Sequence, residues 1–148
     1  MRSEVEKTAH ALGRELLVLN AGTPSEIDAV FATVRQRGVS ALVVAGDNFF
    51  AARNQQIVAL AARDAIPAIY ATRDFVTEGE LMSYGNDVSE AYRLAGSYTA
   101  RILKGEKPGD MPIDQTTKFE FVINLRTAQA LGSKISDNLL SLADEVIE

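Results

Sequence analysis

The stretch ALVVAGDNFF, which runs from Ala41 to Phe50, decides the fold class. Its apolar, β-branched run is typical of a strand covered on both faces, the situation in a parallel sheet, although a buried helical turn shares the pattern. The glycine after this run places Asp47 and Asn48 at the carboxyl end of the strand. In open α/β sheets, ligands bind outside the carboxyl ends of the strands. We therefore expect the functional site in this loop.

Helices and strands alternate on both sides of this stretch. A strand is predicted at Glu15 to Asn20, and a helix follows because Thr23-Pro24-Ser25-Glu26 supplies an N-cap, a proline at the first helical position and a capping-box acid. The next helix is predicted from Asp47 or Asn48 to about Arg63, and Ile66 to Tyr70 forms another strand. This βαβαβ order predicts parallel pairing, and hence a doubly wound, three-layer α/β/α fold with a mostly parallel sheet, Rossmann-like or flavodoxin-like.

The remainder of the chain follows a looser pattern. A short helix is expected at residues 4 to 12, before the first strand. After a strand at Leu81 to Tyr84, apolar residues at helical spacing predict a long helix that ends at Lys104-Gly105. Residues 106 to 115 are proline-rich and predict a connector. Lys118 to Asn124 then alternates like a strand with one wet face, and two short helices are expected after it.

Composition narrows the classes of function. With 148 residues and 47% hydrophobic content, the chain fits a single domain, residues 1–148. A net charge of −5 disfavours nucleic-acid binding, and no apolar run reaches the roughly 20 residues that cross a bilayer. The residues given contain no signal peptide pattern, so we expect a soluble chain. Zero cysteines and one histidine leave no support for a metal site, and no nucleotide-binding motif is present, so no cofactor is expected.

The loop after Ala41–Ala45 carries the first group of candidate ligand residues. Asp47 and Asn48 are suited to accept hydrogen bonds from an α-amino group, and Phe49 and Phe50 offer an apolar or stacking surface. In the alternative interpretation, Asp47 only caps the following helix and the phenylalanines belong to the core. Both interpretations can hold for different atoms.

The next two strand ends carry the second group. Tyr70 and Arg73 lie at the carboxyl end of the strand predicted at Ile66 to Tyr70, where a guanidinium could bind a ligand carboxylate in bidentate fashion. The alternative is a solvated Arg73 paired with Asp74 or Glu78. Ser83, Tyr84 and Gly85 end the next strand and complete the candidate set, with a plain turn as the alternative.

Four separated segments carry a resemblance to a known family. They are GELMSYGND at 79–87, ILKGEKPGDMPI at 102–113, TKFEFVINLRTAQALG at 117–132 and LLSLADEVIE at 139–148. In this order and spacing they resemble the carboxyl-terminal half of ABC transporter substrate-binding proteins of the tryptophan or tyrosine transport type, which have the type I periplasmic binding fold. The similarity covers nearly the whole chain.

The resemblance implies a non-enzymatic solute-binding component of an ABC importer. Such proteins are periplasmic or lipid-anchored, and they close two α/β lobes on a solute such as an aromatic amino acid, which they deliver to a permease. The loop with Asp47 faces the interlobe cleft in this family, and Tyr84 falls near the crossing between lobes. By the same resemblance, this chain is the second lobe, and the helix at 86–107 normally completes a first lobe that the sequence lacks.

The missing lobe has a physical consequence. The face of the long helix with Ala91, Tyr92, Ala95 and Ile102 is expected to be an exposed apolar stripe. We therefore predict a homodimer, with domain swapping through this helix as one way to form it and a repacked monomer as the alternative. A competing hypothesis for function is a freestanding flavodoxin-like domain that acts as a small enzyme or sensor with Asp47 as its acid. A third is a truncated piece with no independent role.

Overall fold

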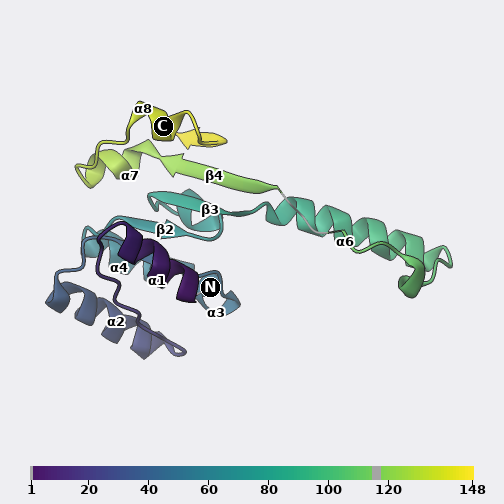
Figure 1. The fold of residues 1–148 in the computed structure, drawn as a ribbon, viewed down its shortest axis with the longest axis horizontal. Coiled ribbons are helices and arrows are strands. Elements are labelled where there is room, and N and C mark those ends of the chain that lie inside the picture. The colour runs from purple at the N-terminus through teal and green to yellow at the C-terminus, as the bar shows by residue number, and fades with distance from the viewer. Residues whose placement is uncertain (1, 115–117) are drawn as a thin grey trace.

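The computed structural model describes residues 2–114 and 118–148. The helices are α1 (Arg2–Ala11), α2 (Pro24–Arg37), α3 (Asn48–Ala51), α4 (Asn54–Arg63), α5 (Asp74–Thr77), α6 (Val88–Leu103), the 3-10 turn η1 (Pro108–Asp110), α7 (Leu125–Ala130) and α8 (Asp137–Leu140). The strands are β1 (Leu42–Val44), β2 (Ala68–Tyr70), β3 (Met82–Asn86), β4 (Phe119–Asn124) and β5 (Glu145–Ile147). Figure 1 shows a layered α/β body from which α6 projects to one side.

The five strands form one mostly parallel sheet in the order β1-β2-β3-β4-β5. β1, β2 and β3 are mutually parallel, β4 runs antiparallel to β3, and β5 is parallel to β4. The carboxyl ends of β1, β2 and β3 therefore share one edge with the amino ends of β4 and β5. This α/β fold with flanking helices confirms the predicted fold class, and the shared edge is where the candidate residues gather.

Local capping explains the second helix. The Thr23 side chain accepts a hydrogen bond from the Glu26 backbone N–H at 3.3 Å, and the Glu26 carboxylate reaches back to the Gly22 N–H at 2.7 Å. Pro24 occupies the first turn, and Gly38 ends the helix with φ of 62°. These contacts satisfy backbone groups that a helix end leaves free, so α2 begins and ends as the sequence predicts.

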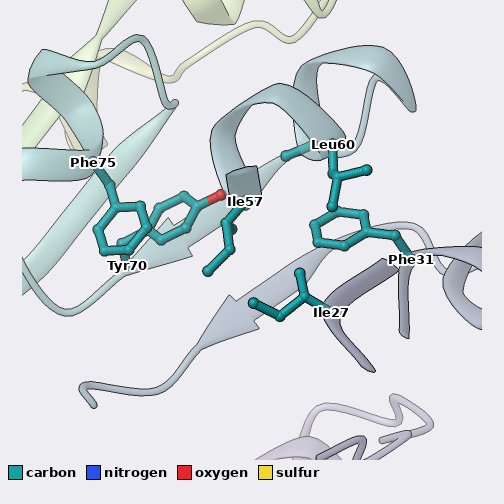
Figure 2. Close-up of a cluster of buried hydrophobic side chains, with 8 residues drawn as sticks. Ile27, Phe31, Ile57, Leu60, Tyr70 and Phe75 are labelled. Atoms are coloured by element: carbon teal, nitrogen blue, oxygen red, sulfur yellow. The ribbon is translucent and has the colours of Figure 1, made fainter. Parts of the chain in front are cut away.

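The main core lies between the sheet and the helices α2 and α4. Figure 2 shows this cluster, in which the rings of Tyr70 and Phe75 stack with centroids 4.3 Å apart. The buried members are Ile27, Phe31, Ile57, Leu60, Ala61, Ala68, Tyr70 and Phe75. Burial of such side chains stabilises the fold by about 1.5–3 kcal/mol each and fixes β1 and β2 beneath the two helices.

Two of the predicted elements are not found as predicted. The strand predicted at Glu15 to Asn20 is wrong, because these residues join no strand in the described sheet, and Leu16, Leu17 and Val18 are 36–40% exposed. An extended segment needs a neighbouring strand to satisfy its N–H and C=O groups, and β1 pairs only with β2 in the described sheet. The helix predicted from Asp47 to Arg63 is broken at Ala52 and Arg53 into α3 and α4. The last residue of the predicted connector, Gln115, lies outside the described residues.

The opposite face of the sheet is only partly covered. The side chains of Val43 on β1, Tyr84 on β3 and Phe119 on β4 are 66%, 54% and 50% exposed. Helix α6 has no buried residue, and its Tyr92 and Leu103 are 75% and 83% exposed. The chain therefore presents apolar surface on the open sheet face and along α6. Among the described residues, no helix has the length and apolar character needed to cross a membrane.

Candidate ligand site at the carboxyl edge of the sheet

Three loops meet where β1, β2 and β3 end. A Cβ atom on Gly46 would lie 3.0 Å from the Ala71 Cβ, and a Cβ atom on Gly85 would lie 1.8 Å from the Ala71 carbonyl oxygen. Only glycine leaves room for the β2 loop to cross β3 at this distance. Gly85, which the sequence places in the candidate set, therefore shapes the floor of the edge through backbone contact.

Asp47 combines the two roles that the sequence left open. Its Oδ1 accepts a hydrogen bond from the Phe49 N–H at 2.7 Å, so the side chain caps α3. The residue is nonetheless exposed, and the structure assigns its second carboxylate oxygen no partner among the described residues. Asn48 beside it is also exposed. One oxygen of Asp47 is thus used in the cap, and the other is available to a ligand.

Phe49 and Phe50 are half-buried. Their rings lie 5.7 Å apart at an interplanar angle of 55°, and both pack against the α2–α4 core. The core alternative is thus correct for part of each ring, and the remaining ring surface is exposed beside Asp47. These rings can contact a ligand only with their outer edges.

Tyr70 and Ser83 lie in the core, each 1% exposed. Neither side chain is accessible to a ligand in this structure, and both contribute to the core beneath the edge of the sheet. The Tyr70 hydroxyl makes no hydrogen bond of standard geometry, and it faces the carboxyl group of Glu80, which is only 4% exposed. Burial raises the pKa of Glu80 from 4.5 to about 7, and burial followed by the Glu80 charge raises the pKa of Tyr70 far above its ordinary value. The pair is a feature that the sequence analysis missed.

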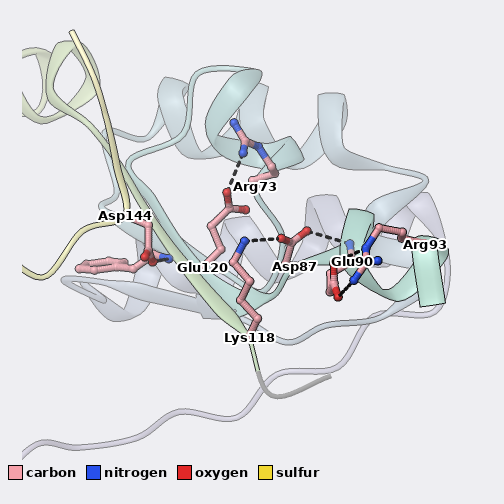
Figure 3. Close-up of polar contacts among 8 residues, drawn as sticks. Arg73, Asp87, Glu90, Arg93, Lys118, Glu120 and Asp144 are labelled. Carbon is pink, nitrogen blue, oxygen red and sulfur yellow. Dashed lines mark hydrogen bonds and ion pairs between the residues drawn. The ribbon is translucent and has the colours of Figure 1, made fainter. Parts of the chain in front are cut away.

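Arg73 is held by two carboxylates from the amino ends of β4 and β5, at the same edge of the sheet. Its Nη1 donates to Glu120 at 2.7 Å and its Nη2 to Glu145 at 2.9 Å, and Figure 3 shows the first of these contacts. Neither partner in the sequence-based alternative, Asp74 or Glu78, is used. The side chain remains 41% exposed, so the guanidinium is within reach of solvent while tying the β2 loop to β4 and β5.

Tyr84 belongs to a cross-strand aromatic cluster on the open face of the sheet. Its ring stacks on Phe119 at 5.5 Å with an interplanar angle of 13°, and it meets the edge of Phe121 at 6.1 Å. Such cross-strand pairs stabilise a sheet by roughly 0.2–1 kcal/mol each. Sequence reasoning missed Phe119 and Phe121 as neighbours of Tyr84, although the alternation in KFEFVIN placed both phenylalanines on one face.

Exposed charged and amide groups and partly exposed aromatic rings lie at this edge of the sheet. The carboxylates of Glu120 and Glu145 bind the Arg73 guanidinium, and Asp47 adds a further, exposed carboxylate at this edge, so a ligand's cationic group is attracted. The one histidine of the chain, His10, lies on α1. Within the described ranges, no group of three or more histidine, aspartate or glutamate side chains could hold a metal ion. The edge provides charge, amide groups and aromatic surface, which suit recognition of a small polar solute.

Comparison with known proteins gives a consistent set of relatives. The sequence model of the family described as ABC transporter substrate binding protein matches residues 2–147. The tyrosine-binding protein of Clostridioides difficile (strain R20291) is 27% identical over 127 residues, which are 84% of this chain and 36% of that protein. The chain thus spans little more than a third of that relative.

Two solved structures have the same fold over nearly the whole chain. One is the crystal structure of the ABC domain in complex with L-Trp from Streptococcus pneumoniae, with a TM-score of 0.84 and 28% identity, over 99% of this chain and 50% of that one. The other is a conserved domain protein from Vibrio cholerae O1 biovar El Tor str. N16961, with a TM-score of 0.85 over 98% of this chain and 49% of that one. At 21% identity, the second likeness concerns the fold alone.

Proposed function

Because this chain belongs to the ABC transporter substrate-binding protein family, we propose that it is one lobe of a solute-binding protein that recognises an amino acid, with aromatic amino acids as the first candidates. The observation that carries the proposal is the family match over residues 2–147, together with relatives named for tyrosine and for L-Trp. Those relatives are substrate-binding proteins, so the proposal includes binding without turnover.

The ligand in this proposal lies at the carboxyl edge of the sheet. The free oxygen of Asp47 and the Asn48 amide accept hydrogen bonds from the α-ammonium group, and the outer edges of Phe49 and Phe50 contact the side chain. Arg73 binds the α-carboxylate after exchanging its contact with Glu145, the more exposed of its two acidic partners at 44% against 20%. Gly85 keeps the floor open, and Tyr84 borders the site.

The proposed mechanism is closure of two lobes on the ligand. The solved relatives are about twice as long as this chain. In this proposal, α6 packs on a second lobe that corresponds to the additional half of those relatives. A ligand that bridges both lobes stabilises the closed state by its higher affinity for that state. The full-length protein would then deliver the solute to an ABC permease from the periplasm or from a lipid anchor. One lobe supplies only part of the contact, so this chain alone binds its ligand weakly.

The uncovered side of α6 leads to a second part of the proposal, which is a homodimer that covers this helix, with domain swapping as one way to form it. Tyr92 and Ile102 on this helix are 75% and 43% exposed. Native mass spectrometry of the parent chain and of Tyr92→Glu tests it. A parent dimer that Tyr92→Glu converts to monomer supports the proposal, and a parent chain that is monomeric at micromolar concentration contradicts it. Ser97→Glu, which adds the same single negative charge at an exposed position of the same helix, is the matched control.

Ligand binding is tested by mapping backbone amide shifts in two-dimensional NMR during titration with L-tyrosine or L-tryptophan. Shifts concentrated at Gly46, Asn48 and Gly85 support the proposed site. Asp47→Asn keeps a helix-capping side chain but removes the charge, so the helix persists while the affinity falls by about tenfold or more, as for a lost charge-assisted hydrogen bond. Asp137→Asn, an equivalent change at the start of α8, leaves the affinity unchanged. Absence of shifts at millimolar amino acid would refute the proposed function.

A further inference from the structure

Helix α6 and the segment that follows it form a separate arm. We define the arm as residues 88–114 and the lobe as residues 2–86 and 118–148. Figure 1 shows the arm extending from the sheet at the ends of β3 and β4. Strand β3 runs into α6 with only Asp87 between them, and Asn86 is in register with Phe119 at the start of β4. The direction of the arm is therefore set at this junction.

The arm is braced within itself. The Tyr98 hydroxyl donates to the Pro112 carbonyl at 2.6 Å and also meets the Asp114 carboxylate at 2.9 Å. Arg101 binds Glu106 through its Nε at 2.7 Å and through Nη2. These contacts fasten the returning segment to α6, so the arm can move as one body about its junction with the lobe.

One residue carries three interactions at that junction. The Asp87 backbone N–H donates to the Lys118 carbonyl at 3.1 Å, and its Oδ2 accepts from the Lys118 ammonium at 3.0 Å. Its Oδ1 accepts from the Glu90 N–H at 3.1 Å and so caps α6. Figure 3 shows the cap and the ion pair side by side. The Lys118 ammonium lowers the pKa of Asp87, and the Asp87 carboxylate raises the pKa of Lys118.

We infer that Asp87 and Lys118 are positioning residues, a latch between the two chain segments that join arm and lobe, and that this latch fixes the direction of the arm. The Asp87 carboxylate both caps α6 and binds Lys118, which directly precedes β4. The direction of α6 is therefore fixed relative to β4 as well as to β3. In the alternative interpretation, Asp87 is only a helix cap beside a surface ion pair that does not affect the direction of the arm. The two differ in whether loss of the ion pair reorients the arm.

The inference deepens the proposed function. If the arm joins a second lobe, then the latch sets how far the cleft opens in the absence of ligand, and this consequence rests on the proposed function. The direction of the arm itself requires no ligand for its measurement. Failure of the latch inference is therefore distinguishable from failure of solute binding.

The absence of cysteine from the chain makes the test direct. Spin labels are attached to Ala62→Cys on α4 and Ser97→Cys on α6, both exposed positions, and double electron–electron resonance measures the distances between arm and lobe. Labelled chain is diluted into excess unlabelled chain, so that distances within one molecule dominate. Asp87→Asn keeps the helix cap and removes the charge, and Lys118→Met keeps the aliphatic stem and removes the ammonium.

The latch predicts that either variant shifts the equilibrium between the parent distance and other distances by up to about fivefold, the range for an exposed ion pair, while far-UV circular dichroism stays unchanged. Lys118→Arg restores the parent distribution. Glu90→Gln, which breaks the neighbouring Glu90–Arg93 pair on the same helix, leaves it unchanged. A distance distribution that is the same in the parent, Asp87→Asn and Lys118→Met would overturn the inference, as would an equal change in Glu90→Gln.

Discussion

The buried Glu80 gives a stability prediction that can be worked out quantitatively. Its pKa is about 7 in the folded chain, against 4.5 for the ordinary carboxyl group, because burial disfavours the charged form. Between these two values the folded state holds a proton that the unfolded state has lost. The free energy of unfolding therefore falls as the pH rises from about 4.5 to about 7, and this contribution is constant above that window. The total loss is up to about 3 kcal/mol, since each pKa unit is worth about 1.4 kcal/mol.

The perturbation is Glu80→Gln, which keeps the shape and removes the titration. Urea unfolding of parent and variant at a fixed protein concentration, at pH values from 5 to 8, gives the difference in stability between them. All other groups titrate alike in both chains, so this difference isolates Glu80. We expect the variant to gain on the parent by up to about 3 kcal/mol as the pH rises from 5 to 8. Parallel stability profiles for the two chains would refute the reasoning.

A companion variant tests the role of Tyr70. Its hydroxyl faces the Glu80 carboxylate and lowers the pKa of that group against the larger effect of burial. Tyr70→Phe keeps the ring stacked on Phe75 and removes the hydroxyl. The pH window in which stability falls should therefore move upward in Tyr70→Phe relative to the parent, and a downward movement would contradict this assignment.

Three further predictions concern single contacts. Gly85→Ala places a Cβ atom 1.8 Å from the Ala71 carbonyl oxygen, so it should lower the free energy of unfolding by about 1–3 kcal/mol, seen as a lower melting temperature. Gly96→Ala lies in open space on α6 and should raise the free energy of unfolding by about 0.5–1 kcal/mol. Equal effects at the two glycines would show that the crossing at Ala71 is not tight. Thr23→Ala removes the α2 cap and should cost about 1 kcal/mol in urea unfolding, an effect that Thr23→Ser should largely avoid. Arg73→Met frees Glu120 and Glu145, and faster amide hydrogen exchange at β4 and β5 than in the parent is expected; unchanged exchange would show that the ion pairs do not tie the strands.

The elements that the sequence predicted well carry their signals locally. The α2 helix has its cap, its proline and its terminal glycine within residues 23–38, and Asp47 caps α3 by accepting from the Phe49 N–H two residues along the chain. The strand at Glu15 to Asn20 was wrong for the opposite reason, because an apolar segment becomes a strand only when a neighbour pairs with it. The three-residue strand β5 lies between charged residues and offers no alternation long enough to detect.

The candidate site divides in the same way. Arg73 was placed correctly at a strand end, but its partners lie 47 and 72 residues further along the chain, and no local pattern indicates them. Tyr70 was predicted at the edge, yet the Phe75 ring and the α4 core bury it, because the last residue of a short strand still points into the sheet's covered face. Sequence therefore located the edge of the sheet that carries the candidate residues, and tertiary packing decided which side chains reach its surface.

The most direct test of the central claim is whether this chain binds an aromatic amino acid at Asp47. The chain has no tryptophan, so added L-tryptophan is the sole indole in solution, and its fluorescence anisotropy reports binding without background from the protein. We predict that anisotropy rises with protein concentration, with a weak affinity for this single lobe, that excess L-tyrosine reverses the rise, and that Asp47→Asn weakens binding by about tenfold or more while Asp137→Asn does not. Anisotropy that stays flat up to millimolar protein, or that rises equally in Asp47→Asn, would contradict the account.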